Sequence, residues 1–327
     1  MARVRAGAPA TALIHLMQQA HPYTKHAYLE ELLPPKRIVF LVNPNAGTRA
    51  QRRLAEALDA HLDHRQFIYT LWHTERPGHA TELAHRARAE GYDIVVAVGG
   101  DGSAHEVAAA LMHTDTAMGI LPAGSGNGLA THLGFGRQLE RAIRLLNTAQ
   151  IQTIDCGCIN GRPFVNVAGI GYDGLVAEHM KYSRRRGFWP YLYHSVRSSF
   201  IFKPVSCTVE LDDQQVSGTF FVVSIANGSM YGYHFQIAPD ARVNDGLFSV
   251  VLFKNVPRWR YFLAIPSSLN GRLYDERFVL HFQSRTVKVT CKERTFVHAD
   301  GESLGMSDCL VCEIVPGALK MLVPTRR

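Results

Sequence analysis

The stretch that decides the fold reads Ile94-Val-Val-Ala-Val-Gly-Gly-Asp-Gly-Ser-Ala-His-Glu-Val107. Its first five residues are all apolar, which is typical of a strand covered on both faces. Ser103 and Glu106 have the spacing of a capping box, which predicts a helix over 103–112. A buried strand, a glycine turn and a helix therefore follow one another, as in an α/β sheet.

The glycine turn also predicts chemistry. Glycines let backbone N–H groups approach a ligand closely, and the N-terminus of a helix favours an anion. Asp101 would repel a bare phosphate, so a carboxylate here is useful if it holds Mg²⁺ or accepts a proton. We interpret Gly99–Ser103 as a phosphate-binding loop, with Asp101 as a candidate catalytic residue.

Strands and helices alternate on both sides of this loop, which indicates a parallel sheet. The expected strands are Ile38–Val42, Phe67–Trp72, Ile94–Val98 and Met118–Leu121. A helix is expected after a Thr48 cap, with Leu54, Leu58 and Leu62 on one face, and a second over 80–90.

A second glycine loop, Pro122-Ala-Gly-Ser-Gly-Asn-Gly128, follows the last of these strands. Ser125 and Asn127 offer a hydroxyl and an amide suited to phosphate or ribose. Both loops end neighbouring strands, so they should face one crevice at the carboxyl edge of the sheet. The sequence contains neither a Walker A motif nor a complete GxGxxG fingerprint.

The second half of the chain has the pattern of a mostly antiparallel β domain, with a boundary near residue 150. Asn160-Gly161 and Asp212-Asp213 each separate two apolar runs and predict hairpins. Further strands are expected at Leu247–Phe253, Phe278–Phe282, Val287–Cys291 and Leu310–Val315, with helices at Tyr191–Phe200 and Arg258–Leu269.

Composition limits the class of protein. A length of 327 residues suits about two domains, and a composition of 46% hydrophobic and 19% charged residues is typical of globular proteins and argues against a disordered chain. No apolar run reaches the ~18–20 residues of a membrane-spanning helix. A net charge of +7 suits anionic partners. The six cysteines are too few for a disulfide scaffold, and Cys309-Leu-Val-Cys312 is interpreted as strand packing rather than a zinc site.

Residues 1–36 are expected to form an N-terminal extension without a secretory signal. They contain Arg3, Arg5 and Lys25 and no acidic residue before Glu30. A transit peptide is one interpretation, and an appended helix around residues 10–20 is the favoured one.

Six motifs resemble, in order, those of the diacylglycerol kinase catalytic family, which includes bacterial lipid kinases and sphingosine kinases. They are Asn43-Pro-Asn-Ala-Gly47, Gly99–Ser103 with Glu106, Pro122–Asn127, Gly171-Tyr-Asp173, Asp245-Gly-Leu247 and Asp300-Gly-Glu302. The resemblance runs from residue 36 to the end of the chain. The Gly-Gly-Asp-Gly motif alone is weak evidence because NAD kinases share it.

The resemblance implies an α/β ATP-binding domain over 37–150 and a β-rich lipid-binding domain over 151–318, with the active site in the cleft between them. The final strand, within 319–327, is expected to return to the first domain. The ATP contacts would be Asn43, Thr74, Gly99, Gly100, Asp101, Gly102, Ser103, Ala104, His105 and Ser125. A structural Mg²⁺ would be held at Arg242, Asp245 and Leu247, where only Asp245 offers a side-chain oxygen. Glu302 would be the proton acceptor, although Asp300-Gly301 alone also fits an ordinary hairpin turn.

The function implied is an ATP-dependent kinase that phosphorylates a hydroxyl of a membrane lipid. Sphingosine kinases carry an acidic pair just after the segment that matches Gly171–Asp173, and one of these carboxylates meets the ammonium group of the sphingoid base. In this chain, aliphatic residues follow Asp173 instead. A diacylglycerol-like lipid is therefore favoured over a sphingoid base. An NAD kinase-like enzyme and a silent nucleotide or lipid sensor are the alternatives.

The segment Lys181–Tyr191 mixes Arg184, Arg185 and Arg186 with aromatic residues. It would dock on an anionic membrane surface, send an arginine to the ATP phosphates, or form a solvated helix face. No nucleic-acid recognition module accompanies it. The expected location is cytoplasmic with peripheral membrane association, and a homodimer is left open.

Overall fold

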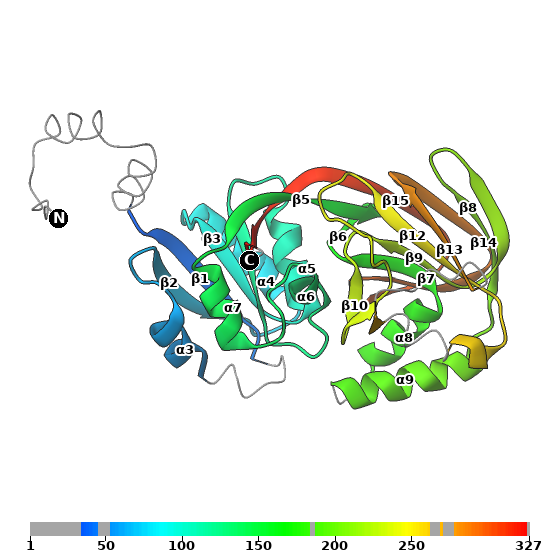
Figure 1. Ribbon diagram of the computed structural model, residues 1–327, viewed down its shortest axis with the longest axis horizontal. Helices are drawn as coiled ribbons and strands as arrows, with labels where there is room; N and C mark the ends of the chain where they lie inside the picture. Colours follow the sequence, from blue (N-terminus) through cyan, green and yellow to red (C-terminus); the bar gives the residue numbers. More distant parts are fainter. Residues whose placement is uncertain (1–33, 45–52, 184–186, 262–268, 271–277, 326–327) are drawn as a thin grey trace, which may run out of the picture.

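A computed structural model describes residues 34–44, 53–183, 187–261, 269–270 and 278–325. Figure 1 shows an N-terminal half with helices around a sheet beside a β-rich C-terminal half, with β5 and β15 running across both. The expected Thr48 cap, Arg184–Arg186, most of the extension 1–36 and most of the helix over 258–269 lie outside the described residues.

The N-terminal half follows the expected alternation of strands and helices. Its elements are β1 (Lys36–Val42), α3 (Leu54–His61), β2 (Phe67–His73), α4 (His79–Ala89), β3 (Ile94–Gly99), α5 (Asp101–Leu111), β4 (Ala117–Pro122), α6 (Gly128–His132) and α7 (Leu139–Leu146). Strands β2, β1, β3 and β4 lie side by side in this order, and each pair is parallel. The carboxyl ends of these strands therefore meet at one edge, where the two glycine loops lie.

Helices pack on this sheet through the predicted apolar positions. Leu54 and Leu58 of α3 and Leu83 and Ala84 of α4 are buried in one core cluster with β3, every residue of which is buried. These contacts confirm the strand and helix positions that the periodicity predicted.

The C-terminal half is built mainly of antiparallel strands. Its elements are β5 (Gln150–Ile159), β6 (Arg162–Phe164), β7 (Val167–Gly171), α8 (Tyr172–Lys181), α9 (Phe188–Ile201), β8 (Val205–Glu210), β9 (Gln215–Ala226), β10 (Met230–Gly232), β11 (Phe235–Gln236), β12 (Phe248–Lys254), β13 (Val279–Ser284), β14 (Thr286–Ala299) and β15 (Glu302–Val323). Both predicted hairpins form, since β5 pairs with β6 and β8 with β9. Asn160 and Gly161 adopt positive φ angles of 48° and 80°, as a two-residue hairpin turn requires.

Strand β15 joins the two halves. The two short strands expected at 310–315 and 319–323 are one strand of 22 residues, with an irregularity between Val315 and Leu319. Its first part pairs with β14, and its end pairs with β5 and, through Met321, in parallel with Met118 of β4. The end of the chain thus completes the sheet of the N-terminal half.

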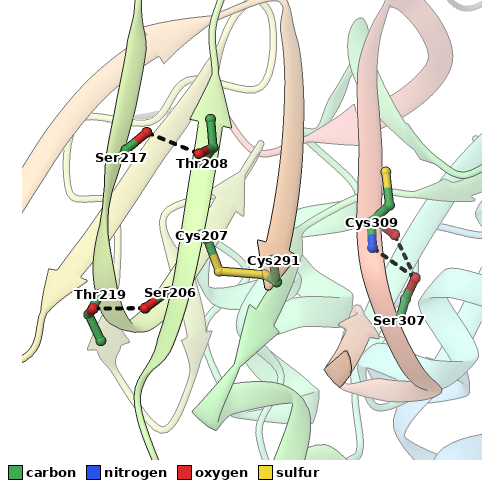
Figure 2. Close-up of a disulfide and its surroundings, with 8 residues drawn as sticks. All are labelled: Ser206, Cys207, Thr208, Ser217, Thr219, Cys291, Ser307 and Cys309. Atoms are coloured by element: carbon green, nitrogen blue, oxygen red, sulfur yellow. Dashed lines mark hydrogen bonds between the residues drawn. A yellow bond between two sulfur atoms is a disulfide. The ribbon is translucent and has the colours of Figure 1, made fainter. Parts of the chain in front are cut away.

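Two further features of the C-terminal half differ from expectation. Helix α8 was not predicted, because Gly171 at its N-cap and Gly174 in its first turn interrupt the apolar pattern. Cys207 and Cys291 form a disulfide between the paired strands β8 and β14, where they lie directly opposite one another (Figure 2). Cys309 and Cys312 are free cysteines within β15, which confirms that this pair belongs to strand packing.

Among the residues that the structure describes, no helix is both long enough and apolar enough to cross a membrane.

Candidate active site

The two glycine loops interlock at the end of the parallel sheet. The N–H groups of Ala123 and Gly124 both donate to the Gly99 carbonyl, at 2.9 and 3.0 Å. A Cβ on Gly124 would lie 2.3 Å from the Gly100 Cα, so position 124 has no room for a side chain. The loops therefore form one backbone surface, with the N-terminus of α5 opening onto it.

Asp101 is the first residue of α5 and is held by the second loop. Its Oδ1 accepts the N–H of Leu129 at 3.1 Å, and its Oδ2 lies 3.1 Å from where a Cβ on Gly126 would be. Burial raises the pKa of Asp101 to about 6, the charge of Asp300 adds to the rise, and the N–H groups of Leu129 and Gly128 oppose it. Such a carboxyl changes protonation state near neutral pH, as acid–base residues do.

The structure places the predicted capping residues differently. Helix α5 begins at Asp101 with Gly100 as its N-cap, so Ser103 lies inside the first turn. The Glu106 carboxylate instead accepts the N–H groups of Gly78 and Ala80, at 2.9 and 3.0 Å. The capping-box prediction is wrong because Glu106 caps the neighbouring helix α4 and not its own.

Asn43 and Thr74 follow β1 and β2 at the same edge of the sheet. The Asn43 amide donates to the Ser103 hydroxyl at 3.2 Å. Thr74 is buried, and its N–H donates to the Val42 carbonyl at 2.9 Å. Asn43 therefore lies beside the first loop, whereas Thr74 is fixed to the end of β1.

Ser125 and Asn127 were predicted to offer polar groups to a ligand, but the Asn127 side chain instead forms hydrogen bonds within the second loop. The Asn127 amide donates to the Gly124 carbonyl at 2.8 Å, and its oxygen accepts the Gly124 N–H at 3.0 Å. These two bonds hold Asn127 in a left-handed conformation at φ 54°, so its side chain closes the loop. The Ser125 carbonyl accepts a bond from Arg137 at 3.2 Å.

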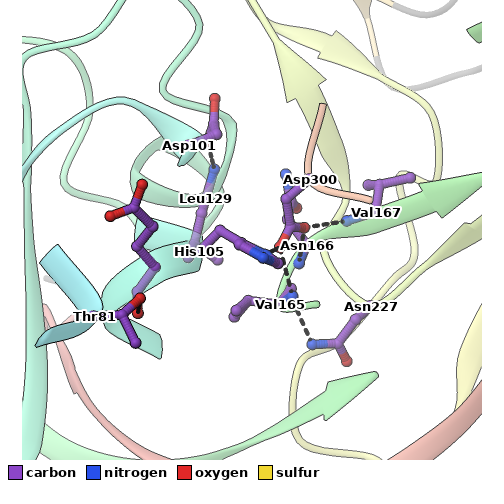
Figure 3. Close-up of polar contacts among 10 residues, drawn as sticks. Thr81, Asp101, His105, Leu129, Val165, Asn166, Val167, Asn227 and Asp300 are labelled. Atoms are coloured by element: carbon purple, nitrogen blue, oxygen red, sulfur yellow. Dashed lines mark hydrogen bonds and ion pairs between the residues drawn. The ribbon is translucent and has the colours of Figure 1, made fainter. Parts of the chain in front are cut away.

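Asp300 connects the C-terminal half to α5. Its carboxylate accepts the N–H groups of Val165, Asn166 and Val167 at 2.8–3.1 Å, and its Oδ2 lies 2.8 Å from Nδ1 of His105 (Figure 3). Burial opposes ionisation of Asp300, but His105 and the backbone donors outweigh it and lower its pKa. Burial likewise opposes protonation of His105, and Asp300 outweighs it and raises the pKa of His105.

Glu302 reaches the first glycine loop from the other half of the molecule. It begins β15 after the turn at Asp300 and Gly301, both of which have positive φ angles. Its Oε1 lies 3.1 Å from where a Cβ on Gly102 would be. The next residue, Ser303, donates its hydroxyl to Glu178 of α8. The structure thus brings a carboxylate of the C-terminal half to the first glycine loop of the N-terminal half.

The predicted metal loop lies beside the paired strands β5 and β15. Oδ1 of the exposed Asp245 accepts the Leu247 N–H at 3.1 Å. Asp155 anchors the loop, accepting the N–H groups of Gly246 and Gly317 at 2.7 Å each. One carboxylate with carbonyl oxygens from Arg242 and Leu247 is a hard donor set, which fits the preference of Mg²⁺. Within the described ranges, no three His, Cys, Asp or Glu side chains gather closely enough to hold a metal ion by themselves.

Sequence reasoning named Asp173 but missed its polar partners and two further polar residues around the site, Asp155 and Asn227. Asp173 accepts hydrogen bonds from Tyr231 at 2.6 Å and from His298 at 3.0 Å. Asn227 donates to the carbonyls of Asp155 and Val165, both at 2.8 Å. Asp155 and His298 each interrupt an apolar strand, and that interruption is the signal in the sequence that could have identified them.

Comparison with known proteins agrees with this architecture. The model of the family described as "Diacylglycerol kinase catalytic domain" matches residues 37–159, and that of the "YegS C-terminal NAD kinase beta sandwich-like domain" matches residues 166–323. The "Probable lipid kinase YegS-like" of Enterobacter sp. (strain 638) is 30% identical over 226 residues, which cover 67% of this chain and 74% of that protein. The "Diacylglycerol kinase" of Bacillus subtilis (strain 168) is 28% identical over 284 residues, covering 83% of this chain and 91% of that protein.

Solved structures show the same fold. A crystal structure of a diacylglycerol kinase from Bacillus anthracis str. Sterne superposes with a TM-score of 0.66 at 19% identity, covering 89% of this chain and 97% of that chain. The chain belongs to the diacylglycerol kinase catalytic-domain family. It is accordingly a kinase, with a catalytic domain followed by a β-rich domain.

Proposed function

We propose that this kinase transfers the γ-phosphoryl group of ATP to the hydroxyl of a neutral membrane glycerolipid of the diacylglycerol class, in the space between its two halves. The observation that carries the proposal is the approach of Glu302 to Gly102. An acceptor hydroxyl bound next to this contact would lie beside both the proposed phosphate-binding loop and a carboxylate.

The interlocked glycine loops support the binding of ATP. Phosphoryl transfer depends mainly on positioning and charge stabilisation, which backbone N–H groups at the N-terminus of α5 supply. Asn43, Thr74, Gly99–His105 and Ser125 are the proposed ATP contacts. Asn43 and Ser103 already share a hydrogen bond at this edge.

Mg²⁺ is the proposed metal, with Arg242, Asp245 and Leu247 as ligands of a structural ion. When bound, Mg²⁺ would supply positive charge to the Asp245 carboxylate and to the two carbonyl oxygens, and so stabilise this loop. Asp155 holds the loop over 242–247 in place through Gly246.

Glu302 is the proposed base. It takes the proton of the lipid hydroxyl while the oxygen of that hydroxyl bonds to the γ-phosphorus, and the bond from that phosphorus to the departing ADP oxygen breaks. A carboxylate within reach of the hydroxyl can do this, and Glu302 is exposed toward the loop. Asp101, whose pKa is raised to about 6, is proposed as a second catalytic residue at the N-terminus of α5.

The proposal of a neutral lipid is supported by the hydrogen bonds that two acidic residues of α8 already make. Asp173 is already bonded to Tyr231 and His298, and Glu178 is bonded to Ser303. A sphingoid ammonium would have to displace these partners to find a carboxylate, and burying it without one costs several kcal/mol. A diacylglycerol headgroup makes no such demand.

The test is a panel of acceptors with labelled ATP and Mg²⁺: diacylglycerol, monoacylglycerol and sphingosine in mixed micelles, and NAD in solution. We expect diacylglycerol to give the highest kcat/KM. Sphingosine as the best acceptor would overturn the lipid class, and NAD would overturn lipid phosphorylation. Nucleotide binding without any transfer would identify a silent sensor.

A further inference from the structure

Helix α9 presents an apolar face to the outside. Trp189, Tyr193, Val196 and Phe200 recur at the spacing of one helix face. Trp189 is 75% exposed, Phe200 62% and Tyr193 60%. Of the thirteen large apolar side chains exposed among the described residues, seven belong to this helix. Figure 1 shows α9 along the outer edge of the C-terminal half, below α8.

The opposite face of α9 is polar and packs on the protein. Ser198 is fully buried, and its hydroxyl lies 2.8 Å from Nδ1 of His179 on α8. The Ser195 carbonyl accepts a bond from Tyr172 at 2.7 Å. A surface helix ordinarily buries its apolar face and exposes its polar face. Since α9 does the reverse, its outer face is built to contact an apolar partner.

The charge around this face is positive. Helix α9 contains Arg197 and no acidic residue. Lys181 precedes it and Lys203 follows it. At the C-terminal end, the described residues that line a groove of about 310 Å³ include Lys203, Arg294 and one acid, Glu293.

Aromatic rings stand at both ends of the face. Trp189 lies at its start. At the other end, Arg258 bonds the carbonyls of Ser199 and Phe202, and the next residue is the exposed Trp259. Arg260 lies over the Trp259 ring, with its guanidinium carbon 5.3 Å from the centroid. Tryptophan rings beside cations are typical of a helix in a bilayer interface.

The apolar face begins beside the candidate active site. The Phe188 ring lies 5.2 Å from the Tyr233 ring, and Arg137 stacks over Tyr233 while bonding the Ser125 carbonyl. Helix α8, on which α9 packs, holds Ser303 next to Glu302. A surface contacted by α9 is therefore close to the phosphate-binding loops.

We propose that α9 lies in the interface of an anionic bilayer, with Trp189, Tyr193, Val196 and Phe200 among the acyl chains. This inference rests on the proposed function, because contact with the bilayer would bring the active site to its lipid substrate. The commitment to a bilayer, rather than to a protein, comes from the combination of an apolar face, positive flanks and terminal tryptophans.

The test compares the full chain with a Trp189→Ser, Phe200→Ser double variant. Binding is measured by flotation with vesicles of phosphatidylcholine alone and with one quarter phosphatidylglycerol. We expect the double variant to bind the anionic vesicles at least about 10-fold more weakly. The matched control is Ile68→Ser, which removes a 57% exposed side chain from β2, and it should bind like the wild type. Equal vesicle binding by all three proteins overturns the proposal. The proposal is also overturned if the wild type does not bind vesicles and instead forms a homodimer that the double substitution dissociates.

A second readout locates the contact without destabilising it. The chain has three tryptophans, at 72, 189 and 259. In Trp72→Phe, Trp259→Phe protein, brominated phosphatidylcholine in the vesicles should quench the remaining Trp189. In Trp189→Phe, Trp259→Phe protein, Trp72, which packs against the N-terminal core, should remain unquenched. Trp189 that is not quenched overturns the proposal.

An assay in detergent micelles separates this inference from the proposed function. The double variant should phosphorylate dioctanoylglycerol in micelles about as fast as the wild type. If neither protein phosphorylates any lipid, the proposed function fails, and the flotation and quenching results still decide the membrane contact.

Discussion

His105 and Asp300 are 195 residues apart in the chain and form an ion pair of 2.8 Å between α5 and the turn that precedes Glu302. The pair fixes the distance between the glycine loop of one half and the carboxylate of the other. Asp300 occupies a positive φ of 49°, so the bonds that it accepts also hold this turn in shape. His105 is thus a positioning residue for Glu302 as well as a proposed neighbour of ATP.

His105→Ala should lower stability by about 2 kcal/mol, because a buried carboxylate loses a charged hydrogen-bond donor while its three backbone donors remain. It should also lower kcat more than it raises KM for ATP. Thermal unfolding and steady-state kinetics check the two effects. His105→Asn should restore part of both, and a variant that loses only ATP affinity would argue against positioning.

The same pair should make stability depend on pH. The raised pKa of His105 means that its stabilisation is complete below its unfolded pKa, near 6.5, and is lost as pH rises through its folded pKa. The lowered pKa of Asp300 means that its stabilisation is present above its unfolded value and is lost as pH falls through its folded value. Denaturant unfolding from pH 5 to 9 should show the alkaline loss in the wild type and not in His105→Ala.

Asp101→Asn should abolish phosphoryl transfer and leave the fold intact. Because the pKa of Asp101 is raised from 3.8 to about 6, its ionisation opposes folding above that range. Removing the charge should therefore raise stability at pH 7 by up to about 3 kcal/mol. An inactive variant with an equal or higher Tm is expected, and near wild-type turnover would refute the role of Asp101.

Glu302→Gln should reduce kcat by about 10²-fold or more with little change in ATP affinity, since the amide keeps the shape and cannot take a proton. Glu313→Gln, an exposed change on the same strand, is the control and should behave as the wild type. A collapse of ATP binding would make Glu302 a nucleotide ligand and move the search for the base to Asp101.

Replacing Arg184, Arg185 and Arg186 together with alanine should weaken binding to anionic vesicles, by about 1 kcal/mol per residue, and less at high salt. The three arginines lie outside the described residues, so this stays a prediction from sequence. Unchanged vesicle binding with poorer ATP affinity would assign them to the nucleotide.

Local patterns predicted most of the fold and of the loops. The apolar run Ile94–Val98, the glycines at 99–102 and the turn at Asn160-Gly161 each specify their own conformation within a few residues. What could not be predicted depends on contacts between distant segments. Glu106 caps a helix that precedes it by a whole strand, and the pairing of Cys207 with Cys291 follows from strand register.

The buried polar contacts of the site could not be predicted either, because they also join segments that are distant in the sequence. Asp173 meets Tyr231 and His298 only after β7, β10 and β14 have come together. The outward apolar face of α9 was also concealed, because periodicity reveals an amphipathic helix without saying which face turns inward.

The course of β15 has a consequence for synthesis. Residues 319–323 lie against β4 and β5, so the sheet of the N-terminal half stays incomplete until this segment has been synthesised. Until then, the N-terminal half carries β4 as an open edge to which other chains could add. We therefore expect nascent or truncated chains that end before residue 319 to need chaperone protection, and a deletion of 319–327 to aggregate instead of yielding a separate catalytic domain.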